Sequence, residues 1–573
     1  MADLARLLSL PLDIDVLQNE RATLLKAIST LDSRRNELAP ISKLSPELLS
    51  EVFLVIAAHS RISADHSEYL SPSELRLCTL AVCHHWRDVA RSCARLWGYI
   101  DFSRDAPERV REALEQSKAT PLVVQANLRS RHGLQNVLLA LKDISRIECL
   151  DLGFQVSHFS ALRPRLVDPA PALAVLRLNC DNSAVTLGPD IFGGEAPSLR
   201  ELELRGCVIS NDSHLLRNLT YLSVDEVPGA GTYTVLEWLV TLESLPLLQV
   251  LSLSKCFSPP PEPHLHELPL VQLSELFSLA MEGCIEDCAD ILNHLIFPPT
   301  PCLEIKCYRG ESESDVASIS TLLETLGKAL NRLPSAQGLR AMGISWRLDG
   351  VKFRATADEG GDVSPSSEDS DFYLAFAPEP LTFGLTLAVL DALPTADVLV
   401  LDLSTPLCHC PPPAHWAFSA DDDWAGLLRR FPAVHSLRRI QYDWATAVFG
   451  LLAPPEEDAE DAAGSDPDTP ASVLQRPADR DLLLPALHTL GFVNTAFDIP
   501  AIIPSLMHLL RTRRERGRQI QHIRADFCKN VLSKMQMLKA VGVEKVQWDG
   551  NNRFEGEEED PPFVPRARRS RGD

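Results

Sequence analysis

One spacing of apolar residues recurs along the middle of the chain. In each copy, an apolar residue is followed three positions later by a second and five positions later by a third. Alternation over so short a stretch predicts a strand whose fourth and sixth residues point inward, as in Leu202 and Leu204. Six copies begin 20 to 29 residues apart: IECLDL at 147–152, LAVLRL at 173–178, LRELEL at 199–204, LTYLSV at 219–224, LQVLSL at 248–253 and LFSLAM at 276–281.

The same spacing persists, at longer intervals, toward the C-terminus. We expect further strands at 339–344, 398–403, 437–442, 487–492 and 543–548, and a first strand at 121–128. Repetition at this period is typical of a solenoid, in which each unit buries its apolar edge only against its neighbours. Cys207, Cys256 and Cys284 each follow a strand at the ninth position, where a small polar group can satisfy backbone groups at the turn.

Apolar residues seven apart predict a helix near the N-terminus that ends before Pro40. The stripe comprises Ile14, Leu17, Leu24, Ile28, Leu31 and Leu38, and its two other places hold Arg21 and Arg35. Two interpretations are open. The arginines favour an amphipathic helix that docks on its own chain over a coiled coil that forms a dimer.

Two more helices are predicted before residue 100. The first begins at Pro46, with Ser45 as its N-cap, and the second runs through 73–93. Trp86 and Trp97 lie eleven residues apart in this region. A helical unit of about sixty residues has only marginal stability alone, so burying surface against a partner would stabilise it. Tryptophan is enriched among the residues that contribute most to binding energy at such interfaces.

Composition narrows the class of protein. The chain has 573 residues, a length that predicts several domains or a repeat array. Its residues are 45% hydrophobic and 23% charged, a composition typical of a folded protein. A formal net charge of −23 argues against nucleic acid or an anionic membrane surface as partner. We expect neither a membrane span nor a secretory signal, and we expect the 14 cysteines to be reduced, as in the cytoplasm or nucleus.

The segments LSPELLSEVF at 44–53 and VCHHWRDVARSCARLWGYI at 82–100 resemble an F-box of the type common in basidiomycete fungi. Ser45 stands where that motif usually has its first proline. The resemblance implies a helical module that binds a Skp-type adaptor and, through it, a cullin. Whether each matching residue packs in the module's core or contacts the adaptor stays open. The positions that match are Leu44, Leu48, Leu49, Phe53, Val82, Cys83, Trp86, Leu96 and Trp97.

The repeated frame resembles leucine-rich repeats of the kind that often accompany F-boxes. The fold class expected is therefore α/β: a small all-helical F-box followed by a leucine-rich-repeat-like solenoid with one strand per repeat. The resemblance implies the substrate-recognition subunit of an SCF-type ubiquitin ligase, in the cytoplasm, the nucleus or both. The alternative is a leucine-rich-repeat scaffold with an F-box-like unit and no role in ubiquitin transfer. No catalytic residue, cofactor or metal site is expected, because no local motif assembles one.

The expected organisation has four parts: an N-terminal amphipathic helix at 1–39, the F-box at 40–103, the solenoid at 104–553 and a disordered tail at 554–573. Two acidic inserts, 355–371 and 454–470, contain six and seven acids and no base. Both are predicted to be disordered loops, because they lack the apolar content that would offset the entropy of ordering.

The target-binding surface is predicted on the strand residues that alternate with the inward leucines. The alternative is a sheet face that is merely solvated. The candidate residues are Arg177, Glu201, Glu203, Arg205, Tyr221 and Asp225. The arginine-rich stretch 511–518 is either an import signal or a solvated basic face.

Overall fold

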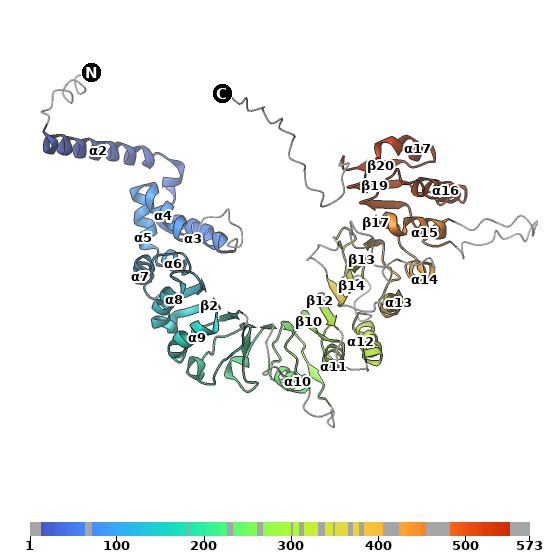
Figure 1. The fold of residues 1–573 in the computed structure, drawn as a ribbon. Helices are drawn as coiled ribbons and strands as arrows, with labels where there is room; N and C mark the ends of the chain where they lie inside the picture. The colour runs from blue at the N-terminus through green and yellow to red at the C-terminus, as the bar shows by residue number, and fades with distance from the viewer. Residues whose placement is uncertain are drawn as a thin grey trace, which may run out of the picture. The chain divides into compact units, whose positions relative to one another are not determined.

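The structure, a computed structural model, describes residues 13–62, 72–181, 183–225, 233–259, 268–298, 302–308, 315–330, 338–347, 350–361, 363–364, 371–377, 383–404, 423–453 and 482–550. It is mixed α/β, with a long and mostly parallel sheet whose strand order is linear and not that of a closed barrel (Figure 1). Two compact units, Met1–Leu248 and Gln249–Asp573, are described in turn.

The α-helices of the first unit up to residue 140 are, in chain order, α2 (Ile14–Glu37), α3 (Pro46–Ile62), α4 (Pro72–Val82), α5 (His84–Ser92), α6 (Ala94–Trp97), α7 (Pro107–Gln116) and α8 (Gly133–Ala140). Ser45 caps α3 as predicted, since its hydroxyl accepts from the Leu48 amide at 3.4 Å. The single helix predicted over 73–93 is wrong. Its chain is extended at Cys83, whose sulfur accepts from the Trp86 amide and caps a new helix, α5.

Helix α2 ends at Glu37 and is followed by a 3₁₀ turn, η1 (Pro40–Lys43), so the predicted stop before Pro40 is confirmed. None of its residues is buried. Among the described residues, the expectation that α2 docks on its own chain is therefore wrong, because none of them packs over its apolar stripe closely enough to bury it.

The strands of the first unit lie at the predicted places. They are β1 (Leu122–Asn127), β2 (Ile147–Phe154), β3 (Val175–Cys180), β5 (Glu201–Arg205) and β7 (Tyr221–Asp225), each parallel to the next. The short strands β4 (Val185–Thr186) and β6 (Cys207–Val208) form a separate pair, and α9 (Val156–Leu162) and α10 (Val235–Glu243) complete the unit. Leu202 and Leu204 are fully buried, which confirms the predicted alternation.

Of the three cysteines that follow the strands, Cys207 has the structural role expected of it, whereas the Cys284 thiol donates to the Asp287 carboxylate at 2.7 Å instead of to the backbone. Cys207 is buried, and its thiol donates to the Leu178 carbonyl at 3.8 Å. Burial raises the pKa of Cys207 and raises that of Cys284 to about 12. Because the thiolate is the reactive form, neither is a nucleophile near neutral pH. Each cysteine within the described residues is a free thiol.

The sheet of the second unit runs in the order β8 (Val250–Ser254), β10 (Ser278–Cys284), β12 (Cys302–Tyr308), β15 (Phe372–Phe376), β14 (Gly350–Thr356), β13 (Ala341–Arg347), β16 (Val400–Ser404), β17 (Ser436–Ile440), β18 (Thr489–Val493), β19 (His522–Asp526) and β20 (Lys545–Trp548). The five predicted C-terminal strands are confirmed as β13, β16, β17, β18 and β20. The frame did not predict β12, β14, β15 and β19. Among these, β14 is antiparallel to both of its neighbours, unlike the parallel pairs that a solenoid implies.

Helices connect most of these strands: α11 (Ile285–His294), α12 (Asp315–Leu330), α13 (Phe383–Ala392), α14 (Trp424–Arg429), α15 (Tyr442–Leu452), α16 (Ile502–Glu515) and α17 (Met535–Ala540). A two-residue pair, β9 (Val271–Gln272) with β11 (Leu295–Ile296), lies outside the main sheet. Parallel strands need such crossovers, and helices are the usual ones.

The prediction that 355–371 is a disordered loop is wrong for the residues the structure describes. Strand β14 extends to Thr356, whose hydroxyl donates to Asp371 at 2.8 Å. Val363 is buried against Ala341 and Val400. The burial of Val363 and the hydrogen bond to the Asp371 carboxylate therefore hold the described residues of this segment against the sheet.

Arg513 corrects the interpretation of 511–518 as a solvated basic face. Its side chain on α16 is fully buried, although Arg511 and Arg514 nearby are exposed. The predicted insert 454–470 and tail 554–573 lie outside the described residues.

Candidate functional site

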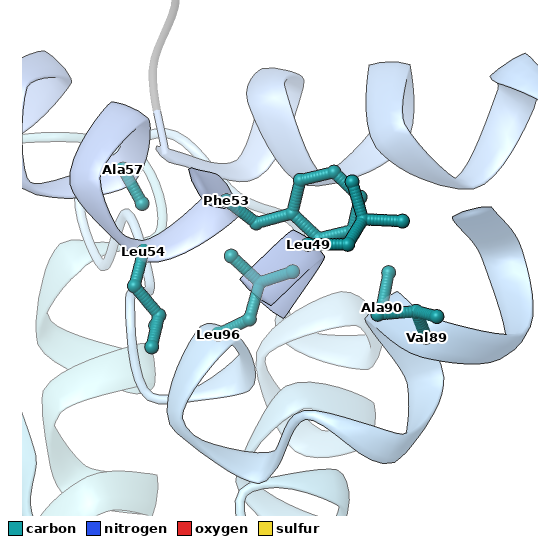
Figure 2. Packing of buried hydrophobic residues seen from close by; sticks show 7 residues of the cluster. All are labelled: Leu49, Phe53, Leu54, Ala57, Val89, Ala90 and Leu96. Atoms are coloured by element: carbon teal, nitrogen blue, oxygen red, sulfur yellow. The ribbon is translucent and has the colours of Figure 1, made fainter. Parts of the chain in front are cut away.

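The helices α3, α5 and α6 enclose a small apolar core, and Figure 2 shows its side chains. Four apolar residues of α3 face this core, because residues about four positions apart lie on the same side of a helix. The buried members are Leu49, Phe53, Leu54 and Ala57 from α3, Val89 and Ala90 from α5, and Leu96 from α6.

The two tryptophans of this region lie in different environments. Trp97 is buried and donates through Nε1 to the Ala90 carbonyl at 2.9 Å, and the buried Arg76 guanidinium lies over its ring at 5.2 Å. Trp86 is half-buried, with its ring centroid 5.1 Å from that of Phe53. Trp97 is therefore a core residue, whereas Trp86 covers the core's edge.

A second apolar face of α3 points outward. It comprises Leu48, Val52, Val55 and Ile56, which we call the α3 face, with exposures of 58%, 38%, 55% and 43%. Residues four and seven positions apart lie on one side of a helix, so the four form one continuous stripe beside the buried one. A helix that is apolar on both sides is normally buried on both sides. The α3 face is thus a surface suited to a partner.

The structure separates the nine predicted adaptor-binding residues into three groups. Leu49, Phe53, Leu96 and Trp97 are buried and are not available to a partner. Leu44, Cys83 and Trp86 are half-buried. Leu48 and Val82 are exposed.

The sequence-based selection missed three members of the α3 face, Val52, Val55 and Ile56. It also missed Leu77, which is 48% exposed on α4. The signal for the first three was present in the spacing from Leu48, since 48, 52 and 55 share one helical side.

The predicted target-binding residues do lie together on one side of the sheet in the first unit. Strand register aligns Asp151, Arg177, Glu203 and Ser223 in a row across β2, β3, β5 and β7. Each is partly exposed, because its neighbours in the strand point to the core. Glu201 and Tyr221 form a second row, and Arg205 and Asp225 a third.

Ion pairs organise this sheet face. Arg177 contacts Glu201 at 3.1 Å and Glu203 at 3.3 Å, and Arg205 contacts Asp225 at 3.5 Å. Burial raises the pKa of Glu203, Arg177 opposes that rise, and Asp151, Asp225 and Glu201 add to it. Burial, with Glu203 adding to its effect, also raises the pKa of Tyr221.

The charge of the sheet face is unbalanced. Four carboxylates, on Asp151, Glu201, Glu203 and Asp225, lie among two guanidiniums, on Arg177 and Arg205. Because the neighbouring carboxylates help to raise the pKa of Glu203, an added cation would stabilise its charged form. The arrangement therefore favours a basic ligand over an acidic one.

Across the described residues, no helix has the length and apolarity to cross a membrane, and no group of three or more His, Cys, Asp or Glu side chains is arranged to hold a metal ion. No known family model matches the chain, and no curated protein matches it in sequence. The α3 face and the sheet face are therefore the features of the chain that bear on its function.

Proposed function

We propose that this chain is the substrate-recognition subunit of an SCF-type ubiquitin ligase, acting in the cytoplasm, the nucleus or both. Residues 40–103 act as an F-box that binds a Skp-type adaptor and, through it, a cullin. The strands that follow act as a leucine-rich-repeat-like array that binds a target protein. The chain itself carries out no catalysis.

The observation that carries this proposal is the α3 face. Leu48, Val52, Val55 and Ile56 present a continuous apolar stripe to solvent, while the adjoining side of the same helix fills the core. Burying such a stripe against an apolar groove is a common way for one protein to hold a helix of another. The exposed Val82 and Leu77 on α4 offer further contacts of the same kind.

The sheet face supports the target-binding half of the proposal. Its carboxylates outnumber its guanidiniums, so we expect it to take a segment of the target that is rich in lysine or arginine. The pairs Arg177–Glu201 and Arg205–Asp225 are partly exposed, and such pairs contribute about 0–1 kcal/mol to stability. Their charges are therefore available for recognition at little cost to the fold.

The alternative is a repeat scaffold whose helical unit serves an assembly without ubiquitin transfer. It uses the same α3 face but recruits no cullin. The two are separated by which proteins co-purify with the chain.

The experiment is co-purification of the full chain with a Skp-type adaptor and a cullin. The paired change Leu48→Glu and Val52→Glu should weaken adaptor binding at least about tenfold, since it puts two charges into the α3 face, which the adaptor would bury. The matched control, Val240→Glu with Leu247→Glu, alters two equally exposed apolar residues outside α3 and should bind normally. Adaptor without cullin would favour the scaffold, and unchanged binding by the α3 variant would overturn the F-box proposal.

A second arm of the experiment addresses the target. Reversing Glu201 and Glu203 to Lys should abolish capture of basic target proteins while adaptor binding stays intact. If the captured proteins are the same after the reversal, recognition does not use the sheet face.

A further inference from the structure

Helix α2 displays an apolar stripe along its whole length that the described part of the chain leaves exposed. Ile14 is 71% exposed, Ile28 54% and Leu31 67%, and no residue of the helix is buried. A 24-residue helix that buries no side chain against the described part of its own chain gains little from tertiary packing. The stripe indicates that another surface completes it.

The spacing of the stripe specifies the kind of surface. Its residues alternate three and four apart without interruption, which is the heptad pattern of a two-helix seam. Every d position is leucine, and the a positions alternate isoleucine and arginine. The d set is Leu17, Leu24, Leu31 and Leu38, and the a set is Ile14, Arg21, Ile28 and Arg35.

We propose that α2 pairs with α2 of a second copy of this chain, in antiparallel orientation. A parallel pair would place Arg21 opposite Arg21 and Arg35 opposite Arg35, so that like charges face each other in the seam. An antiparallel pair with Ile14 opposite Leu38 instead places Arg21 opposite Leu31 and Arg35 opposite Leu17. There each arginine packs its aliphatic stem on leucine and reaches water with its guanidinium.

Charges beside the seam fit the same register. In it, Glu20 of each copy faces Arg34 of the other, which gives two symmetric pairs of opposite charge. In the parallel register neither residue faces an opposite charge, because Glu20 lies opposite Leu25 and Arg34 opposite Ala39. The overlap extends over about 36 Å, the length of α2 at about 1.5 Å per residue. This pairing does not depend on the proposed function, because it uses none of the α3 face.

The test is the oligomeric state of the full chain by sedimentation equilibrium. We expect a dimer that dissociates into monomers when Leu24 and Leu31 are both changed to Glu, with at least a tenfold rise in the dissociation constant. The control, Thr23→Glu with Thr30→Glu, places the same charges one residue earlier, on exposed positions outside the seam, and should remain dimeric. A monomeric wild-type chain, or a dimer that survives the leucine changes, would overturn the proposal.

The orientation has its own test. Glu20→Arg and Arg34→Glu should each weaken self-association, and an equimolar mixture of the two variants should form a heterodimer in which both charge pairs are restored. An absence of rescue in the mixture would contradict the antiparallel register. Adaptor binding, measured on the same variants, should be unchanged, so the outcome here and that of the α3 test are independent.

Discussion

The guanidinium of Arg513 donates through Nε to the carbonyl oxygen of Leu452, at 3.1 Å. Its other nitrogens donate to the carbonyl oxygens of Leu483, Leu484 and Leu487. Leu452 ends α15, and the other three follow the acidic stretch, so one side chain from α16 holds the chain on both sides of 454–481. Burial lowers the pKa of Arg513 to about 10, and the group remains protonated at neutral pH.

Replacing Arg513 by Met should destabilise the second unit by about 2–4 kcal/mol, because several buried carbonyl groups lose their donor at once. Thermal unfolding would show this as a fall of several degrees in Tm. Arg511→Met, on an exposed position of the same helix, is the control and should leave Tm unchanged. Equal Tm values for the two variants would mean that the Arg513 hydrogen bonds contribute nothing to stability.

The two acidic segments should respond differently to replacement by a short Gly-Ser linker. Replacing 454–470 should leave Tm nearly unchanged, because the Arg513 hydrogen bonds hold the chain on both sides and loop length adds little closure cost. Replacing 357–370 should lower Tm, because it removes the buried Val363 and the contact of Glu359 with His435 at 3.1 Å.

Val363→Asp separates packing from loop length in that comparison. It should reproduce most of the loss caused by replacing 357–370, since it buries an unpaired carboxylate among Ala341 and Val400. A Val363→Asp variant as stable as the wild type would show that the segment is dispensable.

Trp97→Ala should cost about 3–5 kcal/mol, the usual range for a large buried side chain, because it also removes the hydrogen bond to Ala90 and the surface under Arg76. Trp86→Ala should cost less, since its ring is half-buried at the edge of the core. Chemical denaturation of both variants measures the difference. A larger loss for Trp86 would be inconsistent with these positions.

Acid should weaken the second unit through His488. Burial lowers its pKa in the fold, and His435 and His522 lower it further, while Glu359 opposes them. The His435 ring stacks on it at 4.8 Å, and His522 lies 6.2 Å away. Because the folded pKa lies below the unfolded value of about 6.5, the contribution of His488 is fully present above that pH. It is lost as pH falls from about 6.5 toward the folded value.

The measurement compares the Tm of the wild type with that of His488→Gln at several pH values between about 7.5 and 5.5, above the range where most carboxylates titrate. The difference between the two proteins should shrink toward the acidic end. A difference that is constant across this window would exclude His488 as the source.

The sequence by itself determined the positions of strands and the ends of helices, because these depend on residues close together in the chain. Alternation placed the strands and their inward leucines, such as Leu202 and Leu204, because a strand's period of two is set by its backbone. Ser45 with Pro46 marked the start of α3, and Pro40 lay just beyond the end of α2, since caps and proline act within one turn.

Only the tertiary structure decided which apolar and charged groups face inward. Leu48 and Leu49 are adjacent and equally apolar, and the packing of α5 and α6 buries one and leaves the other exposed. In the sequence, Val363 lies within an acidic stretch, but in the fold it packs against Ala341 of β13 and Val400 of β16. Arg513 reads as a surface cation, yet its carbonyl partners lie 26 to 61 residues away along the chain. Burial depends on contacts between distant segments, and the local pattern of residues does not contain them.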